Sequence, residues 1–462
     1  MRNFTTVFLP AHTPRISKWA YHPENICRIG FWRPTQTGYV IIRTAMENIN
    51  LAGKIEERLP PRALGAISKA RGLLRERGGR LFLAGGAVRD LLLDKPVWDV
   101  DLVLEGDAMS LAADLAKGED AKITLHKPFL TANLTWPDLS LDLTTARREK
   151  YARPGELPTV EPGNLEDDMS RRDFSINSMA VSLNDDDNGR LIDYCGGLDD
   201  LHNKLMRILH EKSFIDDATR MWRAVRYEQR LDFKLEAGTE ILLKRDLAML
   251  DTITGERIWY ELERVFGEEL PEKVLTRAEE IGLLGYLDPG LRAEGRLQTW
   301  FDNARRMSLP RNPGTQLYLA LLTFNLNDRS LGNIIKRLKV TRAIVQTLHE
   351  THELKARHDA LSAEPLKPSA IYGILKGFSE DAVRANLIAG DSEKASRNIR
   401  LYLEKLRYVK TALNGDELIA FGIKQGPSIK TMLGQLLDAR LDGEVSSRED
   451  EVRLLRQISL FS

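Results

Sequence analysis

The hydrophobic pattern of the chain changes near residue 205, and this change constrains the fold more strongly than any other feature of the sequence. Between about residue 61 and residue 205, segments with the helical spacing of apolar residues alternate with short runs in which every second residue is apolar. Beyond residue 205, apolar residues recur at intervals of three and four. The sequence therefore predicts an α/β domain with a mixed sheet, followed by an all-α region.

The predicted elements of the α/β region are short and closely spaced. Helices are expected at 62–77, 86–93 and 108–117, and strands at 80–84, 97–104, 122–126, 129–135 and 139–145. Few residues separate the last three strands, so hairpins should connect them.

The second region should contain helices alone. They are expected at 215–231, 258–266, 274–284, 318–324, 331–338, 344–354, 370–375, 399–412 and 429–441. Breaks are expected at Pro289, Pro310, Pro365 and Pro427, because proline cannot continue a helix.

The composition limits the kinds of protein that this chain can be. Its 462 residues suggest about three structural units, and 42% hydrophobic with 29% charged residues is typical of a soluble globular protein. No apolar stretch is long enough to span a membrane, and Cys27 and Cys195 cannot build a disulfide framework, so we expect a cytoplasmic protein. Because 67 basic residues balance 67 acidic ones, an anionic partner would have to bind a local basic surface.

Residues 1–45 differ from the rest of the chain. Basic residues are spread along this segment, Glu24 is its one acidic residue, and no helical or strand period persists. We expect a poorly ordered extension, with Met46 as the natural start of the protein. An organellar transit segment is the alternative, which the scarcity of serines disfavours.

Two aspartates alternate with apolar residues in the predicted strand 97–104. Asp99 and Asp101 should project from one face, because alternate side chains of a strand point the same way. Neighbouring carboxylates repel each other unless a cation lies between them, and oxygen ligands suit Mg²⁺. Asp142, on the polar face of the predicted strand 139–145, is a candidate third carboxylate for a site with two metal ions. The alternative is a solvated or edge-strand face.

A double glycine lies between the first predicted strand and the next helix. Backbone N–H groups at Gly85 and Gly86 would be unshielded there and able to hold phosphate oxygens, and Arg89 could add a cation one turn later. A glycine pair at the end of a strand is often only a turn. Followed by the paired aspartates on the next strand, it indicates a phosphate-handling site more specifically.

With these residues in order, the chain resembles the class II tRNA nucleotidyltransferases, the family of CCA-adding enzymes and bacterial poly(A) polymerases within the polymerase β superfamily. The resemblance runs from about residue 80 to the C-terminus. It is carried by Gly85-Gly86-Ala87-Val88-Arg89-Asp90 with Asp99 and Asp101, by RRDFSINSMA at 171–180, by DYCGGLDDL at 193–201, by DDATRMWR at 216–223 and by the segment 256–261.

The resemblance implies a domain order. We expect the extension at 1–45, an α/β nucleotidyltransferase head at 46–206, a helical neck that selects the nucleotide at 207–270, a helical body at 271–358 and a helical tail that binds tRNA at 359–462. The segment 193–201 would be the hinge between head and neck.

The resemblance also implies residue roles. Arg172, Asp173 and Asn177 would lie around the ribose and triphosphate, and Arg223 belongs to the nucleotide-selecting motif. Two departures occur in that motif, because Asp216 stands where the family usually has Glu and Ala218 where it usually has Pro. They affect the rigidity at the start of the helix and leave the base-selecting pair in place.

That pair is Asp217 and Arg220, which would lie three residues apart on one helix face. Cytosine and adenine each present an amino donor beside a ring-nitrogen acceptor, so Asp217 could accept from the amino group while Arg220 donates to the ring. Uracil and guanine present the reverse pattern, and a buried mismatch of donors costs several kcal/mol, on the order of 2 to 5. An ordinary surface ion pair is the alternative.

Further segments distinguish among the activities of the family. Residues 146–160 resemble the flexible loop of members that add the terminal A, with an ordinary mobile loop as the alternative. Segments between 414 and 449 resemble the tRNA-binding tail. Two basic clusters should contact the RNA backbone, although such clusters are often only solvated helix faces; the candidate residues are Lys336, Arg337, Lys339, Lys424 and Lys430.

The sequence thus predicts template-independent addition of C and A to the tRNA 3′ end from CTP and ATP, with Mg²⁺ held by Asp99 and Asp101. An A-adding enzyme or a poly(A) polymerase is the alternative, and a catalytically silent RNA-binding protein a more remote one. The oligomeric state is not indicated by the sequence.

Overall fold

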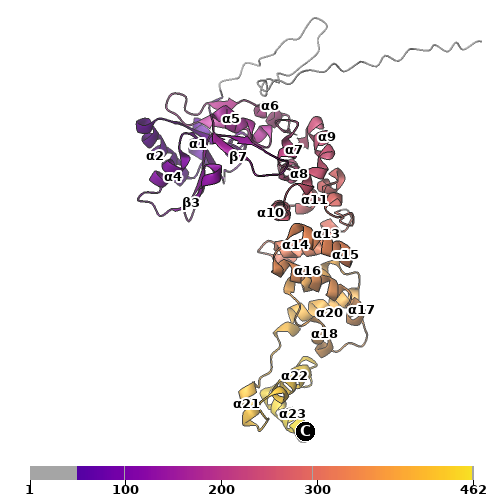
Figure 1. The fold of residues 1–462 in the computed structure, drawn as a ribbon. Helices are drawn as coiled ribbons and strands as arrows, with labels where there is room; N and C mark the ends of the chain where they lie inside the picture. Colours follow the sequence, from indigo (N-terminus) through magenta and orange to yellow (C-terminus); the bar gives the residue numbers. More distant parts are fainter. Residues whose placement is uncertain (1–48, 98, 294, 460–462) are drawn as a thin grey trace, which may run out of the picture. The chain divides into compact units, whose positions relative to one another are not determined.

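A computed structural model describes residues 49–97, 99–293 and 295–459 (Figure 1). The predicted extension at 1–45 and Cys27 lie outside the described residues. The described chain forms two compact units. The head unit comprises 49–147, 162–172 and 177–197, and the helical unit comprises 148–161, 173–176 and 198–459.

The head unit is built on a seven-stranded mixed sheet with the order β3-β4-β5-β2-β1-β8-β9 among the residues described. The strands are β1 (Arg80–Ala84), β2 (Val100–Glu105), β3 (Lys122–His126), β4 (Thr131–Thr135), β5 (Ser140–Thr145), β8 (Met179–Ser182) and β9 (Leu191–Asp193). β2 and β5 pair in parallel, and the other neighbours are antiparallel. The mixed sheet and the hairpins that join β3, β4 and β5 confirm the prediction.

Helices cover this sheet because each has one apolar face. They are α1 (Ala52–Arg58), α2 (Pro61–Arg77), α3 (Gly86–Leu92), α4 (Ala108–Leu115) and α5 (Leu165–Ser170), with a 3₁₀ turn at Lys127–Phe129. In α4, the side chain of Asp107 accepts a hydrogen bond from the Ser110 N–H and caps the helix. Leu111 and Leu115 of α4 are buried as the helix packs on β4 and β5.

The helical unit consists mainly of helices, as predicted. They are α7 (Ser213–Asp216), α8 (Thr219–Leu231), α9 (Ala237–Arg245), α10 (Gly255–Phe266), α11 (Pro271–Ile281), α12 (Leu283–Leu287), α13 (Leu297–Ser308), α14 (Thr315–Thr323), α15 (Asp328–Leu338), α16 (Arg342–Lys355), α17 (His358–Leu361), α18 (Pro368–Leu375), α19 (Glu380–Ala389), α20 (Glu393–Glu404), α21 (Gly415–Ala420), α22 (Pro427–Leu441) and α23 (Arg448–Ser459). α6 (Gly197–His202) lies at the boundary with the head unit, and 3₁₀ turns occur at Ser175–Asn177, Leu247–Asp251 and Leu406–Tyr408.

The expectation that strands stop near residue 205 is wrong in detail. β10 (Leu205–Met206) pairs in parallel with β11 (Lys234–Leu235). Before residue 205, β6 (Arg147–Lys150) and β7 (Thr159–Pro162) form a second small sheet that was not predicted either. A strand of two residues is too short to produce an alternating pattern, which is why β10 and β11 leave no signal in the sequence.

Two predicted helices are also shorter than expected. The helix predicted at 215–231 is interrupted after Asp216, because Asp217 adopts an extended backbone and its carboxylate accepts hydrogen bonds from the Thr219 N–H and hydroxyl at 3.0 and 2.7 Å. The helix predicted at 399–412 ends at Glu404. In the helical unit the prediction also omitted α9, α13, α17, α19, α21 and α23, and in the head unit it omitted α1, α5, β8 and β9.

No helix in the part of the chain that the structure describes is long and apolar enough to cross a membrane. The division of the helical region into neck, body and tail stays a prediction.

Candidate active site

Two predicted catalytic aspartates lie side by side in the head unit. Asp101 of β2 and Asp142 of β5 are register partners on neighbouring parallel strands, so their side chains project from the same face. The flanking leucines Leu102 and Leu141 are fully buried on the opposite face. Asn133 of β4 donates from Nδ2 to Asp142 Oδ1 at 2.8 Å and orients this carboxylate. The strand of Asp142 is thus a neighbour of the strand of Asp101, as the candidate role of Asp142 requires.

Asp99 lies at the start of this strand rather than inside it. β2 begins at Val100, later than predicted, and Asp99 precedes it with an exposed side chain. Convergence of its carboxylate with that of Asp101 stays a prediction. Within the described residues, no three His, Cys, Asp or Glu side chains are grouped so that they could hold a metal ion together. The described residues therefore form no three-carboxylate cage by themselves.

Arg172 is the cation beside Asp101. Its Nη2 atom donates to Asp101 Oδ2 at 3.2 Å and to Asp168 Oδ2 at 3.2 Å, and Asp168 is completely buried. Loss of water around the carboxylate raises the pKa of Asp101; Arg172 opposes this effect, and the carboxylates of Asp168 and Asp142 add to it. Burial acts in the same direction on Asp168, but Arg171 and Arg172 outweigh it and hold the pKa of Asp168 below its ordinary value. The site thus concentrates acidic groups around one shared guanidinium.

The glycine turn lies against the same groups. Gly85 has a φ of 71°, and its N–H donates to the Met179 carbonyl at 3.0 Å. A Cβ atom at Gly85 would lie 2.4 Å from Arg172 Nη1 and 3.3 Å from Asp101 Oδ2. Only glycine fits this position without strain, because the turn needs a positive φ and the backbone touches the Arg172 side chain. Gly86 begins α3 directly afterwards.

Arg89 and Asn177, both predicted to bind the nucleotide, contact each other. Arg89 Nη1 donates to Asn177 Oδ1 at 2.7 Å, and its Nη2 pairs with Asp90 at 2.8 Å. Arg89 is 5% exposed. Its side chain thus fixes Asn177 and α3 to each other within the head unit.

Asp173 and Arg223 form a second such pair, within the helical unit. Arg223 of α8 donates from Nε to Asp173 Oδ2 at 2.9 Å. Although burial opposes the charged form, the Asp173 carboxylate raises the pKa of Arg223 above its ordinary value. Phe174 packs its ring edge-on against Tyr227 of α8, with centroids 6.1 Å apart. Asp173 and Phe174 therefore anchor their segment to α8.

The base-selecting pair is arranged differently from the prediction. Asp217 lies before α8 rather than on it, whereas Arg220 is in its first turn. Arg220 is 6% exposed and donates from Nη1 to Ser213 Oγ at 2.7 Å. The expected i, i+3 arrangement on one helix is therefore wrong, although both residues lie at the same helix start.

Arg257 of α10 holds Asp217. Its Nη2 donates to Asp217 Oδ1 at 2.8 Å, and its Nη1 donates to the Gly155 carbonyl at 2.9 Å. The Gly155 N–H donates in turn to the Asp216 carbonyl at 3.3 Å, and a Cβ atom at Gly155 would lie within 2.3 Å of Thr252. The segment predicted as a flexible loop, 146–160, is thus attached at Gly155 to Asp216 and Arg257, with β6 and β7 at its ends.

Tyr151 of this segment also lies close to the base-selecting pair. Its hydroxyl donates to Glu149 Oε2 at 2.8 Å. Burial raises the pKa of Tyr151, and the Glu149 carboxylate adds to this effect. Arg220 and Asp217 also contribute to the electrostatic field at Tyr151. The phenol therefore stays neutral at this position.

The predicted RNA-binding cations differ in their partners. Arg337 pairs with Asp251 at 2.8 Å, and Lys339 pairs with Glu256 at 3.1 Å. Lys336, Lys424 and Lys430 are exposed and have no ion-pair partner among the described residues. The three lysines are the better candidates for contact with an anionic partner.

Asp168 and Arg257 were not predicted as site residues. Arg257 belongs to the segment 256–261 that carries the family resemblance. That segment was recognised in the sequence, but no role was assigned to its residues. Asp168 lies on the short helix α5, four residues before Arg172. An acidic residue at this spacing from an arginine of the motif could have predicted their ion pair.

Two family models match this sequence. The poly A polymerase head domain matches residues 81–207, and a probable RNA and SrmB-binding site of polymerase A matches residues 232–294.

Curated relatives match most of the chain. An A-adding tRNA nucleotidyltransferase of Geobacter sulfurreducens is 36% identical over 81% of this chain, which spans 44% of that relative's length. An A-adding tRNA nucleotidyltransferase of Halalkalibacterium halodurans is 32% identical over 82% of this chain and 88% of the relative. A CCA-adding enzyme of Geobacillus thermodenitrificans is 28% identical over 85% of this chain and 96% of the relative.

Solved structures show the same fold. An apo form of a CCA-adding enzyme is 30% identical, with a TM-score of 0.75 over 88% of this chain and 98% of the other. The Thermotoga maritima CCA-adding enzyme complexed with tRNA_CCA is 29% identical, with a TM-score of 0.72 over 89% of this chain and 98% of the other. Together with the relative that matches over most of both lengths, these findings show that the chain belongs to the family of tRNA nucleotidyltransferases and poly(A) polymerases.

Proposed function

We propose that this protein transfers nucleotides from CTP and ATP to the 3′ end of tRNA without a template. The observation that carries the proposal is the arrangement in the head unit, where Asp101 and Asp142 lie on neighbouring parallel strands beside the Gly85 turn and Arg172. The family membership and the name of the solved complex with tRNA support the choice of substrate.

The residues of the head unit fit a divalent cation, and we infer Mg²⁺. The donors are carboxylate oxygens alone, and the carboxylates around Asp101 outnumber the one guanidinium that they share. Magnesium often binds through one or two carboxylates, with water and substrate phosphates completing its shell, so a three-carboxylate cage is not required. Asp99 and Asp101 would hold the ion. When bound, it would lower the pKa of the attacking hydroxyl group and neutralise charge on the triphosphate.

The residues of the chain supply binding and orientation. Arg172 fixes the Asp101 carboxylate, and the N–H groups at the start of α3 offer donors to phosphate oxygens. Asp217 and Arg220 would accept from and donate to the Watson-Crick edge of C or A. Arg257 orients Asp217, so it is a positioning residue. No histidine or lysine general base is needed in this scheme.

Among the activities of the family, we propose full CCA addition. The support is the segment 146–160, which resembles the loop of A-adding members, combined with the tail. The second candidate is addition of A alone, which the names of the two A-adding relatives at 36% and 32% identity favour. Cytoplasmic location stays a prediction.

A stepwise assay tests the proposal. Purified protein is incubated with tRNA that ends at the discriminator base, at CC or at CCA, with CTP and ATP supplied separately. Full CCA addition requires CTP incorporation on the first substrate and ATP incorporation on the second. Incorporation of ATP on the second substrate alone would identify an A-adding enzyme, and long A tails on the third would identify a poly(A) polymerase. Binding of tRNA without any incorporation would contradict all three activities.

A further inference from the structure

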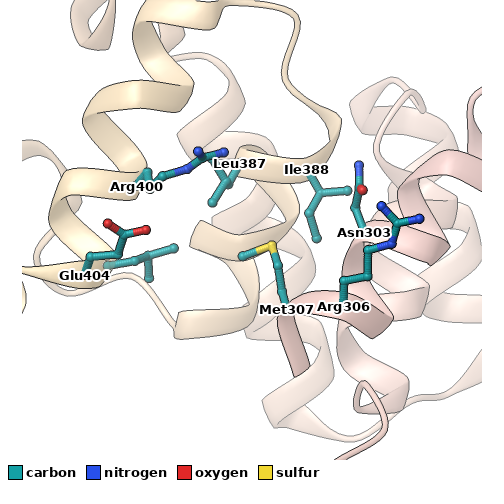
Figure 2. A pocket seen from close by; sticks show the side chains of 8 residues that line it. Asn303, Arg306, Met307, Leu387, Ile388, Arg400 and Glu404 are labelled. Carbon is teal, nitrogen blue, oxygen red and sulfur yellow. The ribbon is translucent and has the colours of Figure 1, made fainter. Parts of the chain in front are cut away.

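A pocket of about 400 Å³ lies among α13, α19 and α20 of the helical unit (Figure 2). Its volume is in the range of sites that bind small ligands. None of the residues that line it belongs to the motifs of the proposed active site. The pocket is therefore a separate feature of the helical unit.

Both charged walls of the pocket carry an arginine without an ion-pair partner among the described residues. Arg306 lies on α13, and Arg400 lies on α20. The neighbouring Arg305 shows the contrast, because Glu272 binds it at 2.7 Å. A guanidinium group that lines a concave surface with no carboxylate bound to it is a ready site for an external anion.

The two walls differ in their polar groups. Figure 2 shows Arg306 and Asn303 together on one side and Arg400 and Glu404 together on the other. The side with Arg306 offers only an amide and a cation, so it suits a phosphate. The other side offers a cation and a carboxylate four residues apart on one helix, and thus a donor next to an acceptor.

Apolar side chains lie between these walls. Met307 and Leu387 lie between the walls in Figure 2, Leu403 also lines the pocket, and Met307 remains 36% exposed. A flexible thioether beside leucines gives a surface on which a planar ring can pack. The complementary ligand therefore has a phosphate at one end and a flat ring with a donor and an acceptor on its edge at the other.

We propose that this pocket binds one nucleoside monophosphate unit whose base is adenine or cytosine. Arg306 holds the phosphate, Glu404 accepts from the amino group of the base, and Arg400 donates to the adjacent ring nitrogen. A free nucleotide and an unstacked nucleotide of RNA share this chemistry.

Equilibrium dialysis with labelled AMP, CMP and UMP tests the proposal. The full-length chain with Asp217→Ala is used, so that binding at the base-selecting residues of the proposed active site does not mask the pocket. AMP and CMP should bind at least about tenfold more tightly than UMP. Adding Arg306→Gln should weaken the binding of AMP by at least about tenfold. Arg397→Gln is the matched control, because Arg397 is an exposed arginine of α20 that does not line the pocket.

A second arm distinguishes the two sources of the ligand. A short single-stranded oligoadenylate is compared with AMP on the same proteins. If the oligonucleotide binds more tightly than AMP and Arg306→Gln removes this binding, RNA is the source of the ligand. If the oligonucleotide binds equally or more weakly than AMP, the free nucleotide is the source. Both results support the proposed pocket. Unchanged AMP binding in Arg306→Gln, or equal binding of AMP and UMP, overturns the proposal. Dialysis measures binding and not catalysis. A failure of the proposed nucleotide transfer would therefore appear in the stepwise incorporation assay and not in this experiment.

Discussion

Arg172 donates a hydrogen bond to Asp101 across 3.2 Å, and the same nitrogen contacts the buried Asp168 at 3.2 Å. Seventy-one residues separate Arg172 from Asp101 in the sequence. The contact places the arginine of one family motif against the carboxylate of another within the head unit. Arg172 therefore orients the carboxylate that we propose as a metal ligand.

Replacing Asp101 should remove nucleotide addition without removing tRNA affinity. We expect Asp101→Ala to lower the rate of CTP incorporation by about 10³-fold or more, because the proposed metal site loses a ligand. The dissociation constant for tRNA should change by less than about twofold, since backbone contacts carry most of that affinity. Asp186→Ala, at a carboxylate that is 73% exposed, is the control. Unchanged incorporation in Asp101→Ala would remove the metal hypothesis.

The two glycines of the turn should respond differently to alanine. Gly85→Ala places a Cβ atom 2.4 Å from Arg172 Nη1 at a φ of +71°, so we expect it to lower the free energy of unfolding by about 1 to 3 kcal/mol. In Gly86→Ala, the atom nearest to the new Cβ would be Arg89 Nη2 at 3.5 Å, an ordinary contact. The free energy of unfolding should therefore change by less than about 0.5 kcal/mol. Urea titrations of both variants measure the difference, and equal stability would contradict the described turn.

Asp217 should control which base is accepted. Asp217→Ala removes the proposed acceptor for the amino group, so we expect kcat/KM for CTP to fall about 10- to 100-fold while that for UTP changes little. Single-nucleotide incorporation with each triphosphate measures the ratio. Glu211→Ala, an exposed acid nearby in sequence, is the control. A variant that retains the wild-type ratio of CTP to UTP would show that Asp217 does not select the base.

His210 should make stability depend on pH. Burial, together with Arg220 and Lys212, lowers the pKa of His210 from 6.5 to about 4. Between these values the unfolded chain binds a proton that the folded chain does not, so stability falls as pH decreases from about 6.5 to about 4. At pH 5 this contribution is on the order of 2 kcal/mol, and His210→Gln should abolish it. Urea unfolding at pH 7 and pH 5 measures it, with His126→Gln, an exposed histidine on β3, as the control; identical pH dependence in wild type and His210→Gln would contradict it.

Lys424 and Lys430 should contribute more to tRNA binding than Lys339, which lies at the end of α15 and forms an ion pair. We expect Lys424→Gln with Lys430→Gln to reduce the slope of log affinity against log salt by about 1.5, because two phosphate contacts are lost. Lys339→Gln should have a smaller effect, since Glu256 already pairs with Lys339 at 3.1 Å. Filter binding over a range of salt concentrations measures both. A larger effect at Lys339 would contradict the assignment.

The sequence predicted five of the seven strands of the head sheet, and missed β8 and β9. Alternating polarity was the signal in β2 and β5, whereas all four residues of β8 are buried and do not alternate. The aspartates lie between buried residues such as Val100 and Leu102, so period two identified both the strand and the polar face. The same argument placed Asp142 on the polar face of its own strand, and the register of the sheet sets it beside Asp101.

Contacts between distant segments could not be predicted in this way. The hydrogen bond from Arg257 to the Gly155 carbonyl joins residues 102 positions apart, and no periodic pattern encodes such a contact. Asp217 was expected on a helix because its neighbours have helical spacing, but its carboxylate competes for the Thr219 N–H and ends the preceding helix. Local side-chain bonding thus overrode the average pattern.

One peptide bond joins Arg172, which belongs to the head unit, to Asp173, which belongs to the helical unit. Each residue is fastened to its own unit, Arg172 to Asp101 and Asp173 to Arg223. No residue lies between these two fastenings, so the loss of either Arg172 or Asp173 would remove the hydrogen bond that attaches this junction to one of the two units.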